Sequence, residues 1–385
     1  MTAYKDTAII NAKLILNNTI VEGKILLFNH KIMDIVENTM LRDNDNLKII
    51  DAKGAYVSAG FIDLHIHGSG GVDVMDATFS ALEQLSATLP QTGTTSFLAT
   101  TMTMSPQDID NALKNIQEHA LDVSGSNIVG VHLEGPFINA SKHGAQDKQY
   151  IQQANVALIE KYISDIKMIT LAPEVEGSED FIKYLVKQYP HIILSIGHSD
   201  ASYEESIQSF EWGISHATHL FNAMNPYHHR KPGIVGAVFD ADVTCDIIAD
   251  LVHTHPSVLE LVHKVKQDKL ILITDAMRAG CMKCGSYDLG GRKVEVTEGK
   301  ALLEDGTLAG SVLLMNEALR NMYTYTSMNR MEVINSVTSI PAEKLGIQKG
   351  KLQVGYDADI VIFDEDFSII TTIISGKVKY QCSDF

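Results

Sequence analysis

The sequence predicts an α/β chain in which a (β/α)8 TIM barrel carries a small β-sandwich domain built from both chain termini. Three observations support this. Short apolar runs alternate with amphipathic stretches through the long central region, short alternating runs occupy both ends, and metal-ligand residue types end several of the central runs. We expect the small β-domain at residues 1–54 and 351–385, and the barrel at residues 55–350.

The two ends of the chain have the pattern of short hairpin strands. The first fifty or so residues contain TAIINAKLIL, IVEGKILLF, KIMDIV and LKIID, with turn-prone pairs such as Asn17-Asn18 and Asn29-His30 between them. The last part contains ADIVIFD at 358–364 and SIITTIISGKVKY at 368–380. Alternation over short runs bounded by turn residues is typical of antiparallel strands. One small β-domain assembled from both termini is therefore expected.

The central region contains eight strand candidates. Parallel barrel strands are buried on both faces and read as nearly continuous apolar runs. An open doubly wound sheet is the main competitor, but it would not easily bring the ends of strands one, three, five, six and eight together. We expect strands at 61–67, 95–101, 128–134, 168–174, 192–198, 214–220, 244–251 and 270–276, and helices at 106–120, 152–164, 178–189, 202–211 and 256–267. The stretch VEVTEGKALLEDGTLAGS predicts an added hairpin and loop over the barrel mouth.

Composition narrows the class of protein. The net charge of −17 argues against nucleic acid and anionic membranes as partners, since a negative surface repels both. No uncharged apolar stretch approaches the ~20 residues that cross a bilayer, and the start lacks a secretory pattern. Four cysteines are too few for a disulfide framework, and the lone CxxC at Cys281 and Cys284 lacks partners for a zinc knuckle. We expect a soluble, cytoplasmic protein.

Candidate metal ligands stand at the strand ends. In FIDLHIH, His65 and His67 occupy positions i and i+2, which point to the same face of a strand. Four more ligand-type residues end other runs: Glu134, His198, His219 and Asp275. Because the carboxyl ends of barrel strands meet at one rim, all six are expected to converge.

This set of residues suits metal-dependent hydrolysis. Glu134, His198 and His219 offer one carboxylate and two imidazoles, which leave an open position for water. His65 and His67 are expected to hold a second ion, with Glu134 bridging the two. A divalent ion lowers the pKa of its water to about 7. The resulting hydroxide would be the nucleophile, with Asp275 moving the proton to the leaving group.

Other polar residues have plainer interpretations. His132 is expected to pack near Glu134 or support it from behind, and His216 to face away from His219 as a structural residue. His228 and His229 fall in a loop and are expected to be solvated. For Glu174, a supporting role and a salt bridge are equally favoured.

The motifs resemble those of the N-acetylglucosamine-6-phosphate deacetylases in the amidohydrolase superfamily. They are HLEGPF (132–137), GHS (197–199), HLFNAM (219–224), TDAM (274–277) and TLAGS (307–311). The likeness covers essentially the whole chain, with Ala59 in SAGFIDLHIHG where proline is usual. It implies that a homodimer deacetylates N-acetyl-D-glucosamine 6-phosphate to D-glucosamine 6-phosphate and acetate in amino-sugar catabolism and recycling.

The resemblance also implies roles for the metal and catalytic residues. Glu134, His198 and His219 match the main ligands, and Asp275 matches the catalytic acid/base. Because both His65 and His67 are present, the chain resembles members with two divalent metals per subunit. Imidazole and carboxylate ligands suit Zn, Fe, Mn and Co alike. His253 matches a histidine that polarises the acetamide carbonyl.

Substrate contacts follow from the same resemblance. Asn222, Ala223 and Arg230 match phosphate contacts, with the arginine supplied by the partner subunit. Many members carry histidine where this chain has Gln146, and glutamine can hydrogen-bond but cannot carry charge. The remaining implied sugar contacts are Ala145, Leu308, Ala309 and Gly310, the last three in a loop that closes on the substrate.

Two other functions remain open at this level. Another amidohydrolase, such as a cyclic amidase or an N-acyl amino-acid deacylase, would share the barrel and metals. A catalytically dead phosphosugar-binding sensor would share the fold, although such a scaffold is expected to have lost ligands, and none is missing here. The preference among N-acetyl hexosamine 6-phosphates is not readable from the sequence.

Overall fold

An eight-stranded parallel sheet lies at the centre of the computed structural model, which describes residues 6–16, 19–38 and 47–383. Its strands follow one another in chain order, each pairing in parallel with the next. The last strand returns to contact the first, and an isolated parallel bridge joins Ile66 to Ala276. The predicted barrel and its eight strands are thus confirmed. They are β8 (Phe61–Ile66), β11 (Thr94–Thr101), β12 (Asn127–Glu134), β13 (Ile166–Leu171), β14 (Ile193–Ile196), β15 (His216–Ala217), β16 (Thr244–Ile248) and β17 (Leu270–Ile273).

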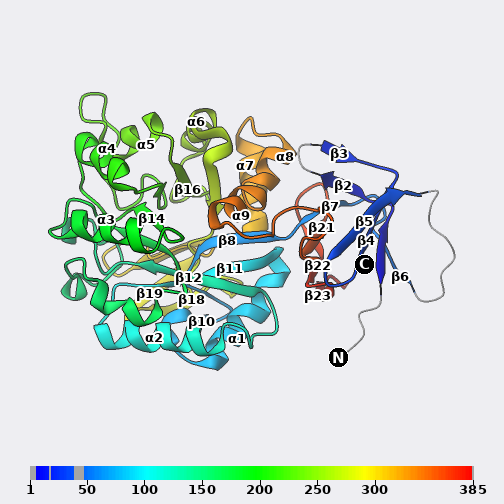
Figure 1. Ribbon diagram of the computed structural model, residues 1–385, viewed down its shortest axis with the longest axis horizontal. Helices are drawn as coiled ribbons and strands as arrows, with labels where there is room; N and C mark the ends of the chain where they lie inside the picture. The colour runs from blue at the N-terminus through cyan, green and yellow to red at the C-terminus, as the bar shows by residue number, and fades with distance from the viewer. Residues whose placement is uncertain (1–5, 17–18, 39–46, 384–385) are drawn as a thin grey trace.

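Helices surround this sheet (Figure 1). Four of the five helices expected from the sequence are present to within two residues of their predicted ends. Their apolar faces pack on the strands, as Ile109, Leu113 and Ile116 of the second helix illustrate. The helices are α1 (Phe79–Thr88), α2 (Pro106–His119), α3 (Ser178–Gln188), α4 (Tyr203–Trp212), α5 (Gly233–Asp240), α6 (Pro256–Lys266), α7 (Met315–Tyr325), α8 (Arg330–Asn335) and α9 (Ser339–Leu345).

The helix expected at 152–164 was wrong. Two 3-10 turns lie there instead, η6 (Val156–Leu158) and η7 (Glu160–Tyr162). The Asn155 side chain accepts a hydrogen bond from the Ala157 amide and caps a turn that ends within three residues. Short 3-10 segments are common connectors of this kind.

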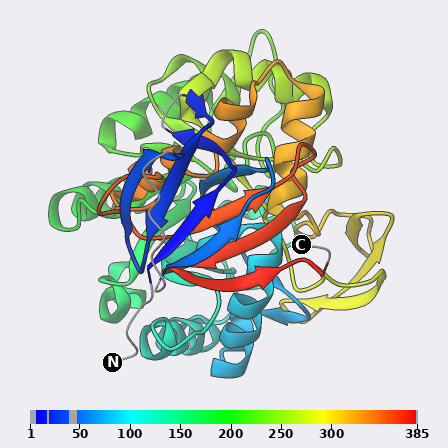
Figure 2. The ribbon, with the colours of Figure 1, turned by 90° about the vertical axis from the view of Figure 1, so that its right-hand side faces the viewer.

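Strands from both termini share one sheet in the small domain. The N-terminal strands are β2 (Lys13–Leu16), β3 (Thr19–Val21) and β7 (Tyr56–Ala59). They join β21 (Ile360–Phe363), β22 (Ile369–Ile374) and β23 (Lys377–Gln381) in the order β23-β22-β21-β7-β2-β3. Figure 2 shows the blue N-terminal and red C-terminal strands side by side. The expected assembly from both chain ends is confirmed.

A four-stranded sheet completes the small domain. It has the order β5-β4-β1-β6, and apolar side chains such as Leu26, Phe28 and Ile362 form the core between the sheets. Val57 of β7 belongs to this core, and the first barrel strand begins four residues later at Phe61. The strands of this sheet are β1 (Thr7–Ile10), β4 (Lys24–Phe28), β5 (Ile32–Glu37) and β6 (Lys48–Asp51).

An antiparallel sheet follows the last barrel strand, and its second and third strands form the hairpin expected from the sequence. It comprises β18 (Gly285–Leu289), β19 (Arg292–Thr297) and β20 (Lys300–Leu303). Its apolar face packs on Met102, Met277 and Ala309, next to the carboxyl end of the barrel. A further strand pair, β9 (Gly68–Ser69) and β10 (Val72–Asp73), lies just after the first barrel strand. Within the described ranges, no helix combines the length and apolar character needed to cross a bilayer.

Candidate metal and catalytic site

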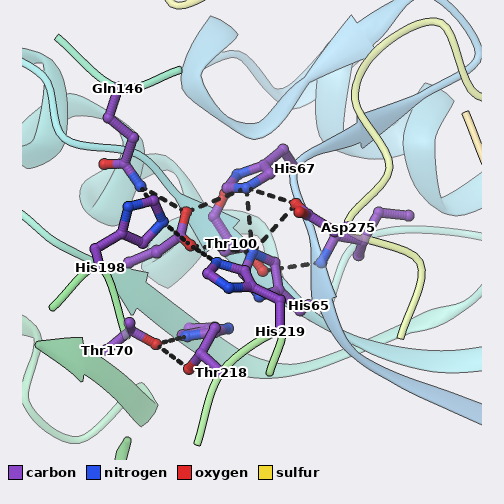
Figure 3. Close-up of polar contacts among 12 residues, drawn as sticks. His65, His67, Thr100, Gln146, Thr170, His198, Thr218, His219 and Asp275 are labelled. Atoms are coloured by element: carbon purple, nitrogen blue, oxygen red, sulfur yellow. Dashed lines mark hydrogen bonds and ion pairs between the residues drawn. The ribbon is translucent and has the colours of Figure 1, made fainter. Parts of the chain in front are cut away.

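The candidate ligands all lie at the carboxyl ends of barrel strands. His65 is in β8 and His67 directly follows it, while Glu134 is the last residue of β12. His198, His219 and Asp275 each follow a strand by two residues. Figure 3 shows His198 on one side of the cluster and His67 with Asp275 on the other. Residues spread over more than two hundred positions of the chain thus form one buried group.

Glu134 is the centre of this cluster. Its Oε1 lies 3.0 Å from His219 Nε2, 3.1 Å from His198 Nε2 and 3.6 Å from His65 Nε2. Its Oε2 lies 3.3 Å from His67 Nε2. Only 3% of Glu134 is exposed, so one buried carboxylate faces all four imidazoles. A buried carboxylate that faces several ring nitrogens is a donor available to a metal cation.

Asp275 faces the histidine pair of the first strand. Its Oδ1 is 3.4 Å from His65 Nε2 and 3.3 Å from His67 Nε2. The two Nε2 atoms are themselves 3.2 Å apart. Ring nitrogens that converge on one another and on carboxylates are the donors that first-row metals take.

Two groups of three ligand atoms have the compactness of a metal site. One is His65, Glu134 and His219, and the other is His65, His67 and Asp275, with all atoms of a group within 4.8 Å of one another. His65 thus belongs to both groups. His198, expected among the main ligands, contacts Glu134 but lies in neither compact group.

The orientation of two rings also fits metal binding. His198 Nδ1 lies 2.9 Å from the Lys142 carbonyl oxygen, and His67 Nδ1 lies 3.3 Å from that of Thr100. A ring that donates from Nδ1 to a carbonyl presents the lone pair of Nε2 to a cation. Both Nε2 atoms point into the cluster, so the donor set fits a divalent ion.

The shifted pKa values of Asp275 and His219 also favour binding of a cation in the cluster. Burial would raise the pKa of Asp275, but the charges of His65, His67 and His219 outweigh burial and bring that pKa to about 2. Burial would likewise lower the pKa of His219, whereas its hydrogen bond to Glu134 and that carboxylate's charge raise it to about 9. Without metal, the carboxylate charges are therefore balanced by protons on histidines whose pKa is raised, His67 and His219. A metal ion would replace those protons.

Buried carboxylates brace the turns that carry the ligands. His198, His219 and Asp275 have φ values of 48°, 32° and 48°, in the left-handed region that non-glycine residues rarely adopt. Asp246 accepts a hydrogen bond from the His219 amide and lies 2.9 Å from His216 Nε2. The expected structural role of His216 agrees with that contact.

Glu174 and His132 support the site from outside the cluster. Glu174 accepts hydrogen bonds from Ser199 Oγ (2.6 Å) and the Asp200 amide (2.7 Å), directly after His198. His132 is fully buried, and its Nε2 lies 2.7 Å from Thr170 Oγ1. Burial lowers the pKa of His132 well below its usual value. Both residues thus hold neighbouring elements in place.

His253 is oriented by Asp250. The Asp250 Oδ2 atom lies 2.7 Å from His253 Nδ1, and Oδ1 accepts hydrogen bonds from the Val252 and His253 amides at 2.9 and 2.7 Å. This arrangement leaves Nε2 as the ring nitrogen available to a molecule in the cavity that His253 lines.

A cavity of about 200 Å³ opens onto the cluster. Most of the substrate contacts expected from the sequence line it: Ala145, Gln146, Asn222, Ala223, His253, Leu308 and Gly310. Four lining residues were not anticipated: Met102, Gly144, Leu289 and Thr307. Thr307 stands within the TLAGS motif, so that motif was the available signal for it, whereas Leu289 comes from the added sheet.

Two expected contacts lie elsewhere. Ala309 does not line the cavity, because its amide donates to the Ala301 carbonyl and its fully buried side chain packs into the core under β18–β20. Arg230 is exposed in the loop before α5 and is not part of the lining. Within one chain, Arg230 thus lies apart from the residues that line the cavity.

Gln146 makes contacts beyond those expected. Its Nε2 donates to Glu134 Oε2 at 2.8 Å, and its Oε1 accepts from the Thr103 amide at 2.8 Å. Gln146 thus reaches the central carboxylate as well as the cavity.

Comparison with known proteins agrees with this geometry. A family model described as "Amidohydrolase family" matches residues 56–379. The N-acetylglucosamine-6-phosphate deacetylase of Bacillus subtilis (strain 168) is 43% identical over 333 residues, covering 83% of this chain and 84% of that protein. The protein of the same name from Lysinibacillus sphaericus is 40% identical and covers 92% of both chains. The crystal structure of N-acetylglucosamine-6-phosphate deacetylase from Pasteurella multocida superposes with a TM-score of 0.92 at 32% identity, covering 97% of this chain and 99% of that one.

Proposed function

The chain belongs to the metal-dependent amidohydrolase family and, within it, to the N-acetylglucosamine-6-phosphate deacetylases, and from this we propose its reaction. It hydrolyses the N-acetyl amide of N-acetyl-D-glucosamine 6-phosphate and releases D-glucosamine 6-phosphate and acetate. The observation that carries the proposal is the buried cluster of four imidazoles and two carboxylates at the floor of the cavity.

We propose two divalent cations per subunit. Glu134, His198 and His219 would hold one, and His65, His67 and Asp275 would hold the other, with Glu134 close to both groups of histidines. When bound, such ions act as Lewis acids that polarise a carbonyl and favour deprotonation of water near neutral pH. The donor atoms are compatible with Zn, Fe, Mn or Co.

Asp275 is the proposed proton carrier. Its low pKa keeps the carboxylate ionised at neutral pH, so it can accept a proton from the attacking water. The water oxygen adds to the acetyl carbon, and the amide C–N bond then breaks. Asp275 returns the proton to the departing amine, which completes the release of acetate.

His253 is proposed to bind the acyl oxygen. Its Nδ1 is engaged by Asp250, so its Nε2 can face that oxygen and stabilise the negative charge that develops there. Gln146, held between the Thr103 amide and Glu134, is placed to contact a sugar hydroxyl without adding a charge.

Phosphate recognition is proposed to need a second subunit. Among the described residues that line the cavity, none is a lysine or an arginine. A dianionic phosphate nevertheless requires a cationic partner. Arg230 projects from an exposed loop near Asn222 and Ala223 in sequence, which suits delivery of its guanidinium to the partner's site in a homodimer. A cytoplasmic location is part of the proposal, and the four unpaired cysteines favour it.

The proposed reaction is tested by measuring acetate release from N-acetyl-D-glucosamine 6-phosphate with metal content quantified in the same sample. N-acetyl-D-galactosamine 6-phosphate and unphosphorylated N-acetylglucosamine serve as comparison substrates. No acetate from any of them at any metal loading, together with hydrolysis of a cyclic amide or an N-acyl amino acid, would transfer the chain to another amidohydrolase activity.

Replacing both His65 and His67 by asparagine is expected to remove one of two metal equivalents. His198 Nε2 and His219 Nε2 each remain within 3.1 Å of Glu134 Oε1, so these three residues can still hold an ion. Elemental analysis of protein equilibrated with Zn²⁺ provides the measurement. The matched control replaces His228 and His229, an exposed histidine pair, and should retain both equivalents. One equivalent in fully loaded wild type would contradict the two-ion site.

Replacing Arg230 by alanine is expected to lower kcat/KM for the phosphorylated substrate by about 10- to 150-fold. A hydrogen bond to a charged group contributes roughly 1.5–3 kcal/mol, and each 1.4 kcal/mol is about tenfold. Unphosphorylated N-acetylglucosamine should be a poor substrate that is hardly affected. Lys231→Ala, the adjacent exposed cation, is the control and should have a small effect.

Mixed dimers of two variants can show whether Arg230 acts in its own subunit's site or in the partner's site. In a heterodimer of Arg230→Ala and Asp275→Asn chains, one site carries both defects and the other carries neither, so activity should return. If verified heterodimers recover none, each chain uses its own arginine or Arg230 does not bind phosphate.

A further inference from the structure

The seam at which the barrel closes lies between its first strand, β8, and its last, β17. The direct hydrogen bonding between these strands is interrupted at Ile62 and Leu272. The Ile62 amide donates to the Val337 carbonyl (2.7 Å), and the Leu272 amide donates to the Ser336 carbonyl (3.2 Å). The turn after α8 therefore takes hydrogen bonds that β8 and β17 would otherwise exchange. A regular ladder cannot transmit strand register across this part of the seam.

Toward the carboxyl ends of the strands, hydrogen bonds join β8 and the residues after β17 directly, at the candidate site. The Asp275 amide donates to the His65 carbonyl (2.9 Å), and the His67 amide donates to the Ala276 carbonyl (2.9 Å). The catalytic candidate and the histidine pair therefore face each other across the seam. The position of Asp275 relative to the histidine pair, measured along the strands, therefore depends on the contacts that join β8 to the end of β17 beside them.

The Asp63 side chain joins the two strands next to these residues. It is fully buried, and its Oδ1 accepts hydrogen bonds from the His65 amide (3.2 Å) and the Thr274 amide (3.3 Å). Its Oδ2 accepts the Thr274 hydroxyl at 2.6 Å. One carboxylate thus ties the strand that carries the histidine pair to the residue directly before Asp275.

We propose that Asp63 is a positioning residue that sets the place of the Asp275 carboxylate relative to His65 and His67. The inference rests on the proposed function of Asp275 and adds a residue to it. Asp275 sits in a left-handed conformation with its Oδ1 within 3.4 Å of both Nε2 atoms, so it has little freedom to adjust. A misplacement of about 1 Å at a reacting group can cost roughly 10²-fold in rate.

Burial of the Asp63 carboxylate at this position also costs free energy. Burying a polar group costs free energy unless hydrogen bonds compensate, and an apolar side chain would meet no such cost. The compensating donors of Asp63 all come from the two segments that must be aligned, namely the His65 amide and both Thr274 donors. This distribution is what an aligning residue requires.

Kinetics provides the first test. At saturating metal, Asp63→Ala and Thr274→Val are each expected to lower kcat by about 10- to 100-fold while KM changes little. Asp63→Asn, which keeps an acceptor oxygen, should recover much of the loss. In an Asp275→Asn background, Asp63→Ala should cost nothing further, because the group it positions is already absent. Full additivity in that background, or an unchanged kcat in both single variants, would overturn the proposal.

Asp359→Ala is the matched control for removal of a buried carboxylate. Asp359 accepts from Lys349 Nζ (2.6 Å) and the Ser375 amide (2.8 Å) in the small domain. Its loss should lower thermal stability and leave kcat unchanged. Should Asp63→Ala fail to fold, Thr274→Val removes the Thr274 hydroxyl from the opposite side of the seam.

A second measurement needs no substrate. With Co²⁺ bound, the visible absorption bands report on the carboxylate near the histidine pair. The spectra of Asp63→Ala and Thr274→Val should shift toward that of Asp275→Asn, and spectra identical to wild type would overturn the inference. If wild type releases no acetate, the proposed function fails, while the Co²⁺ comparison still decides the role of Asp63.

Discussion

Asp275→Asn is expected to lower kcat by ~10²–10⁴, the range typical of a positioned acid/base. Asparagine has the same shape but can neither accept the proton of the attacking water nor return it to the amine. KM for the phosphorylated substrate should change little, because the proposed phosphate and sugar contacts are made by residues other than Asp275. Steady-state acetate release at saturating Zn²⁺ gives both parameters.

The metal content of the Asp275→Asn variant has to be measured as well, because loss of metal would also lower kcat. The group Glu134, His198 and His219 does not include Asp275, so at least one equivalent should persist in the variant. Asp288→Asn, a half-exposed acidic residue of the added sheet, is a control that should keep wild-type kcat. A metal-loaded Asp275→Asn protein within a few-fold of wild type would assign proton transfer to another group.

The barrel was predictable because its strands are short, apolar and regularly spaced. Ile247 and Ile248, for example, are fully buried in β16, as a continuous apolar run indicates. The segment 152–164 has a helical spacing of apolar residues, but only Ile159 and Tyr162 are buried there. In this segment the apolar spacing therefore did not correspond to a buried helix face, and the Asn155 side chain caps a short 3-10 turn instead.

The candidate ligands were predictable for a related reason. A histidine or carboxylate at the end of an apolar run is a local pattern, and the closed barrel brings such ends together. Asp63 shows where this reasoning stops. It precedes His65 in an ordinary apolar run, and its partner Thr274 lies 211 positions away. Contacts of that separation depend on barrel closure and on the turn after α8, neither of which leaves a local signal.

The substrate cavity was predicted less completely. Leu289 reaches it because the added sheet packs on the barrel end against Met102, and sequence spacing does not specify that packing. Ala309 was expected beside Leu308 and Gly310, but its amide donates to the Ala301 carbonyl and the loop turns at Gly310, whose φ is 59°. Leu308 and Gly310 line the cavity, whereas Ala309 faces the core of the sheet.

Glu134→Gln is expected to reduce metal affinity by more than the ~10–100-fold typical of residues that only support a ligand. Glu134 alone faces all four imidazoles, at 3.0 to 3.6 Å from their Nε2 atoms. Its amide replacement offers one weaker donor oxygen and no charge. Acetate release should fall in proportion to lost metal, and elemental analysis after dialysis measures both equivalents.

The control for this change is Glu174→Gln. Glu174 is also a carboxylate near a strand end, but its oxygens accept hydrogen bonds from Asn139, Ser199 and Asp200 and from no imidazole. It should lose at most ~10–100-fold in metal affinity. Equal losses in the two glutamine variants would mean that Glu134 supports the site without holding the ion.

The metal-free proteins should also differ in the pH dependence of stability. Glu134 raises the folded-state pKa of His219 to about 9, above the value of about 6.5 in an unfolded chain. A raised pKa stabilises the fold fully below pH ~6.5, and this stabilisation is lost as pH rises through about 9. Removing the Glu134 charge should therefore destabilise the metal-free protein most at pH 6. Denaturant unfolding at pH 6 and pH 9.5 should show the difference between wild type and Glu134→Gln shrinking at the higher pH. A difference that grows with pH would show that Glu134 does not stabilise protonated histidines.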